Sequence, residues 1–293
     1  MKITKWLQSL VARIIDIQSR IHKIQEALGR IESRQSVTPW NGRLAAREFR
    51  TFSQWGEDGI IQALIHTVEI RQKIFIEFGV TNYTESNTRF LLMNNNWKGL
   101  LIDGNAAHIE YIKNDPIYWQ HNLKADCTFI TRENINEIFR SNGVSGEIGL
   151  LSIDIDGNDY WVWKEITAVN PAIVVVEFNA RFGKDRAVTV PYDPAFTREK
   201  AHYSNIYYGA SLKALSRLGC EKGYAFVGAN SAGNNAFFVR RDLMTPPLRE
   251  MTVEEGYTKN QFRESRSPDG SLAFLTYEQE CALVEKLPLV EIA

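Results

Sequence analysis

Acidic residues end one apolar run after another through the middle of this chain. The runs at 73–79, 98–104, 125–130, 148–156 and 172–178 carry, at or near their ends, Glu77, Asp103, Asp126, Asp154 with Asp156, and Glu177 with Asn179. Charges at the rim of a buried sheet must be paired or bound to a ligand. The pattern therefore predicts a binding site along one edge of a sheet.

The spacing of the first two acids indicates the class of ligand. Gly79, two residues after Glu77, has no Cβ and lets the backbone approach a bound molecule. Asp103 ends the next run, where a carboxylate can accept hydrogen bonds from both hydroxyls of a ribose. Neither G-x-G-x-x-G nor a P-loop is present. A nucleoside without phosphates therefore fits better than a dinucleotide, and S-adenosylmethionine is the common one.

The segment 154–159, Asp-Ile-Asp-Gly-Asn-Asp, allows three interpretations. A calcium loop of the EF-hand type would need glycine where Asp159 stands. A pair of carboxylates spaced D-x-D could hold a metal ion on the diphosphate of a nucleotide sugar, as in a glycosyltransferase. The third interpretation, which we favour, is the rim of a methyltransferase site, with one Asp toward the cofactor and another toward the acceptor.

The same segment also supplies a candidate metal site. Asp154 and Asp156 should point to one side of an extended chain, and Glu177 and Asn179 repeat this spacing on the neighbouring strand. Four oxygen ligands of this kind could hold Mg²⁺. A hydrogen-bonded rim without metal is the alternative.

Methyl transfer to a hydroxyl needs a base that takes the proton. Asp156 and His202 are the candidates, although a histidine in a loop is more often plain surface. His202 lies in the polar segment 181–209, which we expect to cover the acceptor. The aromatic residues of this segment would either stack on a sugar ring or pack the lid. They are Tyr192, Tyr203, Tyr207 and Tyr208.

The elements that position these residues follow from the alternation of apolar runs with amphipathic stretches. Helical patterns at 58–69, 107–115 and 134–142 separate the strands. This alternation predicts an α/β fold, a Rossmann-like doubly wound and mostly parallel sheet covered on both faces. Two further runs, 224–229 and 235–241, predict a hairpin that adds an antiparallel edge strand. In such sheets ligands bind beyond the carboxyl ends of the strands.

The N-terminal 36 residues have a different pattern. Apolar residues recur at alternating steps of three and four, and we call them the heptad seam: Leu7, Leu10, Ile14, Ile17, Ile21, Ile24, Leu28 and Ile31. This predicts a coiled coil that makes a homo-oligomer, and Ile at both core positions favours three or four strands. Packing on the chain's own domain is one alternative. The positive balance of the segment leaves docking on an anionic membrane as another.

The remaining boundaries follow from composition. Residues 37–50 form a linker, 51–243 the Rossmann-like domain and 244–293 a C-terminal extension with a helix near 276–287, in which we see no chemistry. A net charge of −1 gives no support for nucleic-acid binding. Three widely spaced cysteines argue against a disulfide framework and favour a reducing cytoplasm. No apolar run approaches the length of a membrane span, and no signal peptide is expected, so peripheral attachment at the inner face of the membrane is the only membrane alternative.

From about Phe52 to Leu243 the chain resembles the FkbM-like branch of class I methyltransferases. The stretches that carry the resemblance are 53–61, 75–88, 99–105, 150–163, 174–183, 207–215 and 223–243. The resemblance implies O-methylation of a sugar, glycolipid or polyketide with S-adenosylmethionine as the donor.

Residue by residue, the resemblance places Glu77 and Gly79 beside the methionine portion of the cofactor, and Asp103 on its ribose. It also implies that Asp126 lies near the adenine amine and Asp154 under the sulfonium. Thr81 and Tyr83 stand where the family has further glycines, and Asn82 could supply a polar contact instead. Three functions remain: a sugar O-methyltransferase, a metal-dependent glycosyltransferase, and a coiled-coil assembly factor with a degenerate methyltransferase domain.

Overall fold

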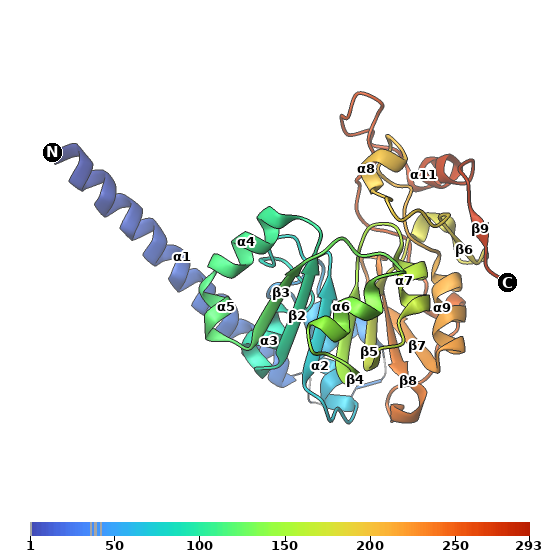
Figure 1. Ribbon diagram of the computed structural model, residues 1–293, viewed down its shortest axis with the longest axis horizontal. Coiled ribbons are helices and arrows are strands. Elements are labelled where there is room, and N and C mark those ends of the chain that lie inside the picture. The colour runs from blue at the N-terminus through green and yellow to red at the C-terminus, as the bar shows by residue number, and fades with distance from the viewer. Residues whose placement is uncertain (1, 36, 38–39, 42) are drawn as a thin grey trace.

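The computed structural model describes residues 2–35, 37, 40–41 and 43–293, and places a seven-stranded sheet between two layers of helices (Figure 1). The strand order is β3-β2-β1-β4-β5-β8-β7. The strands are β1 (Ile74–Phe78), β2 (Lys98–Asp103), β3 (Leu123–Cys127), β4 (Gly146–Ile153), β5 (Val169–Glu177), β7 (Tyr224–Ala229) and β8 (Asn235–Arg240). The first five are parallel, and β8 runs antiparallel to both of its neighbours, β5 and β7. The predicted mostly parallel, Rossmann-like sheet is confirmed.

Both faces of the sheet are buried, as the near-continuous apolar strands predict. In β5, Val174 and Val176 face one helix layer, while Ile173 and Val175 face the other. The helices of the first layer are α6 (Ile135–Ser141), α7 (Asp159–Glu165) and α9 (Leu212–Glu221). Those of the second are α2 (Glu57–Thr67), α3 (Arg89–Asn95), α4 (Ala106–Asn114) and α5 (Pro116–Gln120). The three cysteines are free.

Strand β4 ends earlier than the sequence predicts. Its last residue is Ile153, and the segment 154–158 is a loop. The Asp159 carboxylate accepts hydrogen bonds from the backbone N–H groups of Ile155 and Gly157, which takes these donors away from the sheet ladder. Asp156 has a left-handed backbone (φ +54°). The argument that Asp154 and Asp156 share one side of an extended chain is therefore wrong, although the loop still brings them together.

The segments 180–210 and 260–292 form a separate layer, here called the cap, beyond the carboxyl ends of the strands (Figure 1). Its elements are η2 (Ala180–Phe182), β6 (Val188–Thr189), α8 (Arg198–Ala201), α11 (Tyr277–Val284) and β9 (Val290–Glu291). Strands β6 and β9 pair antiparallel. A small core of its own, with Val188, Ile206 and Val284 fully buried, joins the predicted lid to the C-terminal extension. Three short elements link these parts: η1 (Leu44–Arg47), η3 (Arg241–Leu243) and α10 (Val253–Gly256).

Helix α1 (Lys2–Gln35) projects from the body and docks only by its last turns (Figure 1). Ser33 Oγ donates to Gln62 Oε1 at 2.8 Å, and the backbone of Gly29 lies against Thr51 and Phe90. The heptad seam does not take part, since its eight side chains are 41–60% exposed. Packing of the seam on the chain's own domain is therefore wrong. In the described residues, no helix has the length and apolarity to cross a membrane.

The linker assigned to residues 37–50 is partly packed. Leu44 in η1 is buried, and the Glu48 carboxylate accepts hydrogen bonds from the backbone and hydroxyl of Ser231. Trp40 also packs against the second core and lies under the Arg47 guanidinium, so the described residues from Trp40 onward belong to the body.

The close approach at Gly29 predicts how the docking of α1 can be disrupted. A Cβ at this position would lie 2.4 Å from Thr51 Oγ1 and 2.7 Å from a ring carbon of Phe90. We expect Gly29→Val to lift the end of α1 from the body, because overpacking at a buried contact costs about 1–3 kcal/mol. Hydrogen exchange of the amides of residues 25–35 should accelerate about tenfold. Ser19→Val, in the projecting part, should leave that exchange unchanged; equal exchange in both variants would contradict the docking.

Candidate active site

Two adjoining cavities open at the carboxyl ends of the parallel strands, around the point where β1 lies between β2 and β4. The first, called the pocket, has a volume of about 490 Å³ and lies over β2. The second, called the cleft, has a volume of about 450 Å³ and extends over β5 to the cap. Both are lined by Gly79, Thr81, Asp154, Asp156 and Arg198. These residues form the junction of the two cavities.

Gly79 is required by a close backbone contact between two strands. It has a left-handed backbone (φ +63°), and a Cβ at this position would lie 1.8 Å from the carbonyl oxygen of Asp154. A side chain here would force the ends of β1 and β4 apart. The glycine therefore allows the ends of β1 and β4 to approach closely at the junction.

The loop after Gly79 keeps a glycine-type backbone without glycines. Thr81 (φ +45°) and Tyr83 (φ +61°) are both left-handed, which costs a non-glycine residue about 1–2 kcal/mol. Contacts hold the conformation in place. The Tyr83 ring is buried, its hydroxyl shares a hydrogen bond with Thr88 Oγ1 at 3.0 Å, and Arg89 Nη1 donates to its carbonyl at 3.0 Å.

Glu77 fastens this loop to the end of β1. Its buried carboxylate accepts hydrogen bonds from the backbone N–H of Asn87 (2.8 Å), and from both the backbone N–H (3.0 Å) and the hydroxyl of Thr88. Burial raises the pKa of Glu77 to about 7, although these hydrogen bonds act in the opposite direction. Glu77 lines the cleft, so its predicted place beside a ligand agrees with the geometry, but its first task is to shape the loop.

Asp103 lies at the end of β2 and lines the pocket. Its Oδ2 accepts from the Thr81 N–H at 2.9 Å, while Oδ1 accepts from the Asn105 N–H at 2.8 Å and lies 3.2 Å from His108 Nδ1. Each oxygen has two lone pairs, so Oδ2 keeps capacity for a ribose hydroxyl. The apolar walls of the pocket suit a nucleobase, and they are Ile102, Phe129, Ile130, Ile155 and Phe196.

Two of the other predicted cofactor residues do not line either cavity. The Asp126 carboxylate accepts hydrogen bonds from Thr128 Oγ1 and Asn142 Nδ2, which draws it toward the end of α6. The predicted strand is displaced by two residues, so Phe129 and Ile130 reach the pocket in its place. Asn82 closes a local turn, since its Oδ1 accepts from the backbone and hydroxyl of Thr84. The placements predicted for Asp126 and Asn82 are thus corrected.

Two further predictions fail because the side chains concerned already form hydrogen bonds within the cap. Asn179 is buried, and its Nδ2 donates to the carbonyl oxygens of Ile206 and Tyr208 while its Oδ1 accepts from the Arg181 N–H. It is therefore not available as a metal ligand. His202 lies outside both cavities, with Nδ1 bonded to Ser204 and its ring in a tilted contact with Tyr203. The role of base cannot fall to His202 in this conformation.

The four tyrosines of the predicted lid also pack within the protein. Tyr207 and Tyr208 are buried, the half-exposed Tyr203 makes a tilted contact with His202, and Tyr192 lies under the Arg132 guanidinium. None of the four lines the cleft or the pocket. The packing alternative is the correct one.

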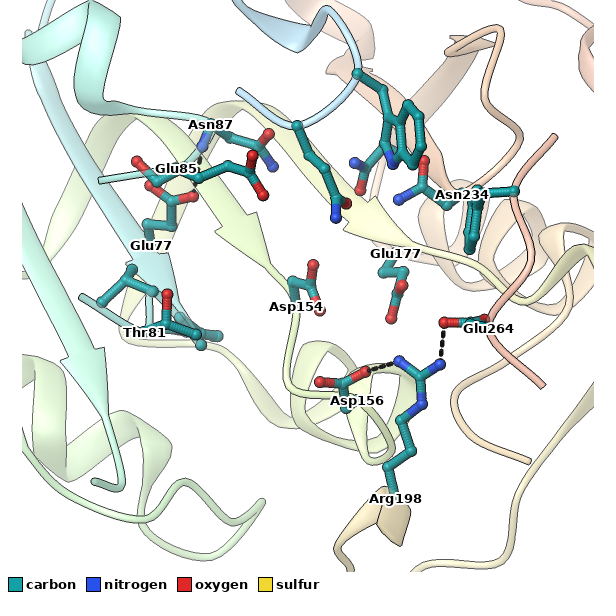
Figure 2. Close-up of a pocket in the computed structure, with 18 of the residues that line it drawn as sticks. Glu77, Thr81, Glu85, Asn87, Asp154, Asp156, Glu177, Arg198, Asn234 and Glu264 are labelled. Atoms are coloured by element: carbon teal, nitrogen blue, oxygen red, sulfur yellow. Dashed lines mark hydrogen bonds and ion pairs between the residues drawn. The ribbon is translucent and has the colours of Figure 1, made fainter. Parts of the chain in front are cut away.

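Three carboxylates converge at the junction (Figure 2). Asp154, Asp156 and Glu177 each place an oxygen within 4.8 Å of the others. Burial, followed by repulsion between the carboxylates, raises the pKa of both Asp154 and Glu177 well above the usual range. Glu177 Oε2 is buried with no hydrogen-bond partner in the described part of the chain. Such a cluster binds a cation or holds a proton.

Arg198, from helix α8 of the cap, reaches into this cluster. Its guanidinium forms ion pairs with Asp156 (2.7 Å) and Glu264 (Figure 2). The same guanidinium lies over the ring of Tyr208. Glu264 also pairs with the buried Arg181 at 2.9 Å. Two distant segments of the cap are thereby joined over the acidic junction. Nothing in the local sequence marks Arg198 or Glu264, because their relevance depends on how the cap folds back.

The outer wall of the cleft also comes from segments to which the sequence assigned no role. Trp55 and Phe262 stack with ring centroids 5.3 Å apart and planes 18° apart. Glu57 Oε2 accepts from the N–H groups of Trp55 and Gly56, which fixes the loop before α2. The other oxygen of Glu57 accepts from the amides of Asn230 and Asn235. The polar residues beside this wall are Gln54, Glu85, Ser86, Asn87, Asn234, Asn235, Arg263 and Glu264.

Several of these residues could have been found in the sequence. Gln54 and Trp55 belong to the stretch 53–61, and Asn234 and Asn235 to 223–243, both of which carry the family resemblance. These residues are polar or aromatic and had no assigned role, which is the feature of the sequence that could have indicated that they line a site. Phe262 and Glu264 gave none, and the prediction that the C-terminal extension carries no chemistry is wrong for these lining residues.

No protein-family model matches the chain, and no curated protein matches it in sequence. Among solved structures, the chain is similar to the N-terminal domain of EvdMO1 with SAH bound, at 11% identity over 72% of this chain and 94% of that one, with a TM-score of 0.40. It is also similar to TrmK of M. capricolum in complex with S-adenosyl-homocysteine (10% identity, 64% and 70% coverage, TM-score 0.37). A third is an S-adenosylmethionine-dependent methyltransferase from Clostridium acetobutylicum (6% identity, 57% and 83% coverage, TM-score 0.36). These values are low, so the chemistry of the site has to be inferred from its own residues.

The raised pKa of Glu77 predicts a pH-dependent stability. Because its pKa is about 7 in the folded chain and 4.5 without the fold, the protonated form is favoured by folding. Its contribution is complete below about pH 4.5 and is lost as the pH rises through 7, on the order of 3 kcal/mol in all. Denaturant unfolding should show this decline in the wild type and a decline smaller by about 3 kcal/mol in Glu77→Gln, because other buried carboxylates with a raised pKa, such as Asp58 and Asp159, are still present. Parallel curves for the two proteins would refute the assignment.

Proposed function

We propose that this chain is an S-adenosylmethionine-dependent O-methyltransferase that acts on a sugar hydroxyl. The observation that carries the proposal is the acidic junction between a nucleoside-sized pocket and a polar cleft. S-adenosylmethionine has a sulfonium cation between its nucleoside and its transferable methyl group. A cation at the junction would neutralise the half-buried Asp154, which lines both cavities.

The charges that line the two cavities distinguish this function from glycosyl transfer. A nucleoside diphosphate needs cationic or N–H partners for its phosphates. The lining is instead dominated by carboxylates: Glu77, Glu85, Asp103, Asp154, Asp156, Glu177, Glu199 and Glu264. Of the two lining arginines, Arg198 is already paired with Asp156 and Glu264. The surroundings of the D-x-D pair therefore favour a cationic ligand.

In the proposed complex, the adenosine lies in the pocket and the acceptor in the cleft. Asp103 holds the ribose through Oδ2, with the nucleobase against Ile102 and Phe129. The methionine portion follows Gly79 to the junction, which directs the methyl group toward the cleft. Because the sulfonium is already activated, in-line positioning of the acceptor oxygen supplies much of the rate enhancement.

The cleft supports a sugar as the acceptor. Trp55 and Phe262 form one aromatic wall, and the neighbouring groups are amides and carboxylates such as Gln54, Asn87 and Asn234. An aromatic ring can pack on the C–H face of a pyranose, while planar polar groups bind its hydroxyls. A purely apolar acceptor would leave these polar groups unpaired.

Glu177 is the best placed group to accept the proton of the acceptor. Its Oε2 is buried, lines the cleft and is unpaired in the described part of the chain. Asp156, the candidate from sequence, is already engaged in an ion pair with Arg198 at 2.7 Å. A cation at the junction would favour the charged form of Glu177, so cofactor binding would prepare it to act as a base.

Mg²⁺ is the alternative cation for this cluster. Asp154, Asp156 and Glu177 offer the carboxylate oxygens that Mg²⁺ prefers, so the residues fit the ion even without Asn179. The Arg198–Asp156 ion pair, however, already supplies one positive charge, and the sulfonium would supply a second. We therefore propose that methyl transfer proceeds with Arg198 and the cofactor as the counter-ions.

Asp103→Ala tests cofactor binding. Loss of charge-assisted hydrogen bonds to a ribose should weaken binding of S-adenosylhomocysteine about tenfold or more, measured by calorimetry. Asp126→Ala is the matched control, because this acid lies on the neighbouring strand but outside the pocket. Equal affinities in the two variants would remove the ribose role of Asp103. Binding of a nucleoside diphosphate in place of S-adenosylhomocysteine would favour the glycosyltransferase, and no binding up to millimolar concentration would favour the non-catalytic assembly factor.

Glu177→Gln tests the base. With an acceptor found by screening sugars against a labelled methyl donor, we expect kcat to fall by about 10²–10⁴, with little change in the affinity for S-adenosylhomocysteine. EDTA should leave the turnover of the wild type unchanged. Activity that disappears in EDTA and returns with Mg²⁺ would instead make Glu177 a metal ligand.

A further inference from the structure

The projecting part of helix α1 is exposed on every described side. All described side chains from Trp6 to Ile24 are exposed, and contacts with the body begin near Gln25. A helix that is surrounded by water gains nothing from packing, and isolated helices of this length are marginal. Its sequence also lacks an acidic residue in the first turn. This segment therefore needs a partner that the single chain does not provide.

The two faces of α1 have separate roles. Of the residues that meet the body, Gly29 and Ser33 lie on the outer face of the helix, away from the heptad seam, while Gln25 flanks the seam. In a coiled coil this outer face is the one that remains accessible. The body thus occupies a position that leaves the whole seam, from Leu7 to Ile31, open to other helices.

We propose that the seam binds the same seam of further copies of this chain, as a coiled coil that carries the bodies on its outside. Its eight side chains, each about half exposed, present an apolar strip on the order of several hundred Å², comparable with the ~800 Å² per partner of a standard interface. The alternating steps of three and four residues match a self-complementary seam, whereas a membrane-bound helix has a wider apolar face. Beside the seam, Arg13 and Arg20 come opposite the uncharged Gln18 and Gln25 of a parallel partner, so no like charges meet.

The assembly should be independent of the proposed activity. None of the described residues of α1 lines the cleft or the pocket. A coil that joins the seams therefore leaves both cavities open, and a monomeric variant should retain the fold and the ligand affinity of the body.

The experiment measures the mass of the full chain by sedimentation equilibrium. At about 10 μM, the wild type should have a mass of at least twice the 33.5 kDa of one chain. Ile17→Glu with Ile21→Glu should reduce the mass to that of one chain, since two charges at core positions prevent the seam from closing. Ser19→Glu with His22→Glu adds the same charge on the outer face and should leave the assembly intact. Near-UV circular dichroism of each variant shows that the body remains folded.

Two results would overturn the proposal. One is a wild type that remains a single chain up to about 100 μM, and the other is a seam variant that keeps the mass of the wild type. If the wild type is a single chain but sediments with vesicles containing phosphatidylserine, and the seam variant does not, the seam is a membrane surface.

Discussion

The structure depends on one electrostatic constraint: carboxylates buried at the ends of parallel strands cannot remain charged without a counter-ion. Asp154 and Glu177 are the clearest cases, because desolvation and repulsion by neighbouring carboxylates, Asp156 above all for Asp154 and Asp154 for Glu177, raise the pKa of both. The protein supplies one positive charge, Arg198, and directs it to Asp156, the most exposed member of the cluster. Asp154 and Glu177 are the members for which we propose a cationic ligand. This unequal neutralisation is the basis of the proposed cation site at the junction.

The surrounding elements can be understood as supports for that junction. Glu57 holds the loop that carries Trp55 from below, and its other oxygen fixes Asn235 of the β7–β8 hairpin. From above, Glu264 joins Arg181 and Arg198, so the C-terminal segment closes over the same point. Segments that are far apart in the sequence are thus held by charged hydrogen bonds, which are stronger than neutral ones and specific in direction. The cleft owes its shape to these contacts more than to the sheet itself.

The sequence predicted the sheet, the helix layers and the acidic rim, because each depends on local periodicity. Glu77, Asp103 and Asp154 line the cavities, as the sequence predicts, because the carboxyl ends of parallel strands meet at one edge of the sheet. Asn179 and His202 were not, because their hydrogen-bonding partners lie in a cap whose folding no local pattern reveals. Arg198 and Phe262 were missed for the same reason. Asp126 lies on the predicted strand, but its carboxylate is bonded to Thr128 and Asn142, a contact that the strand pattern does not reveal.

The departure from glycine in the loop after β1 argues for a working site rather than a degenerate one. A left-handed Thr81 carries a cost that selection for stability alone would remove, yet this backbone is what directs its N–H to Asp103 Oδ2. Tyr83 carries a similar cost, and its buried hydroxyl contacts Thr88, which is itself bound to Glu77. The two strained residues therefore connect the carboxylates at the ends of β1 and β2. A chain that no longer bound a ligand could relax this loop at no cost to function. The retained strain therefore indicates that the carboxylates of Glu77 and Asp103 must be held in fixed relative positions.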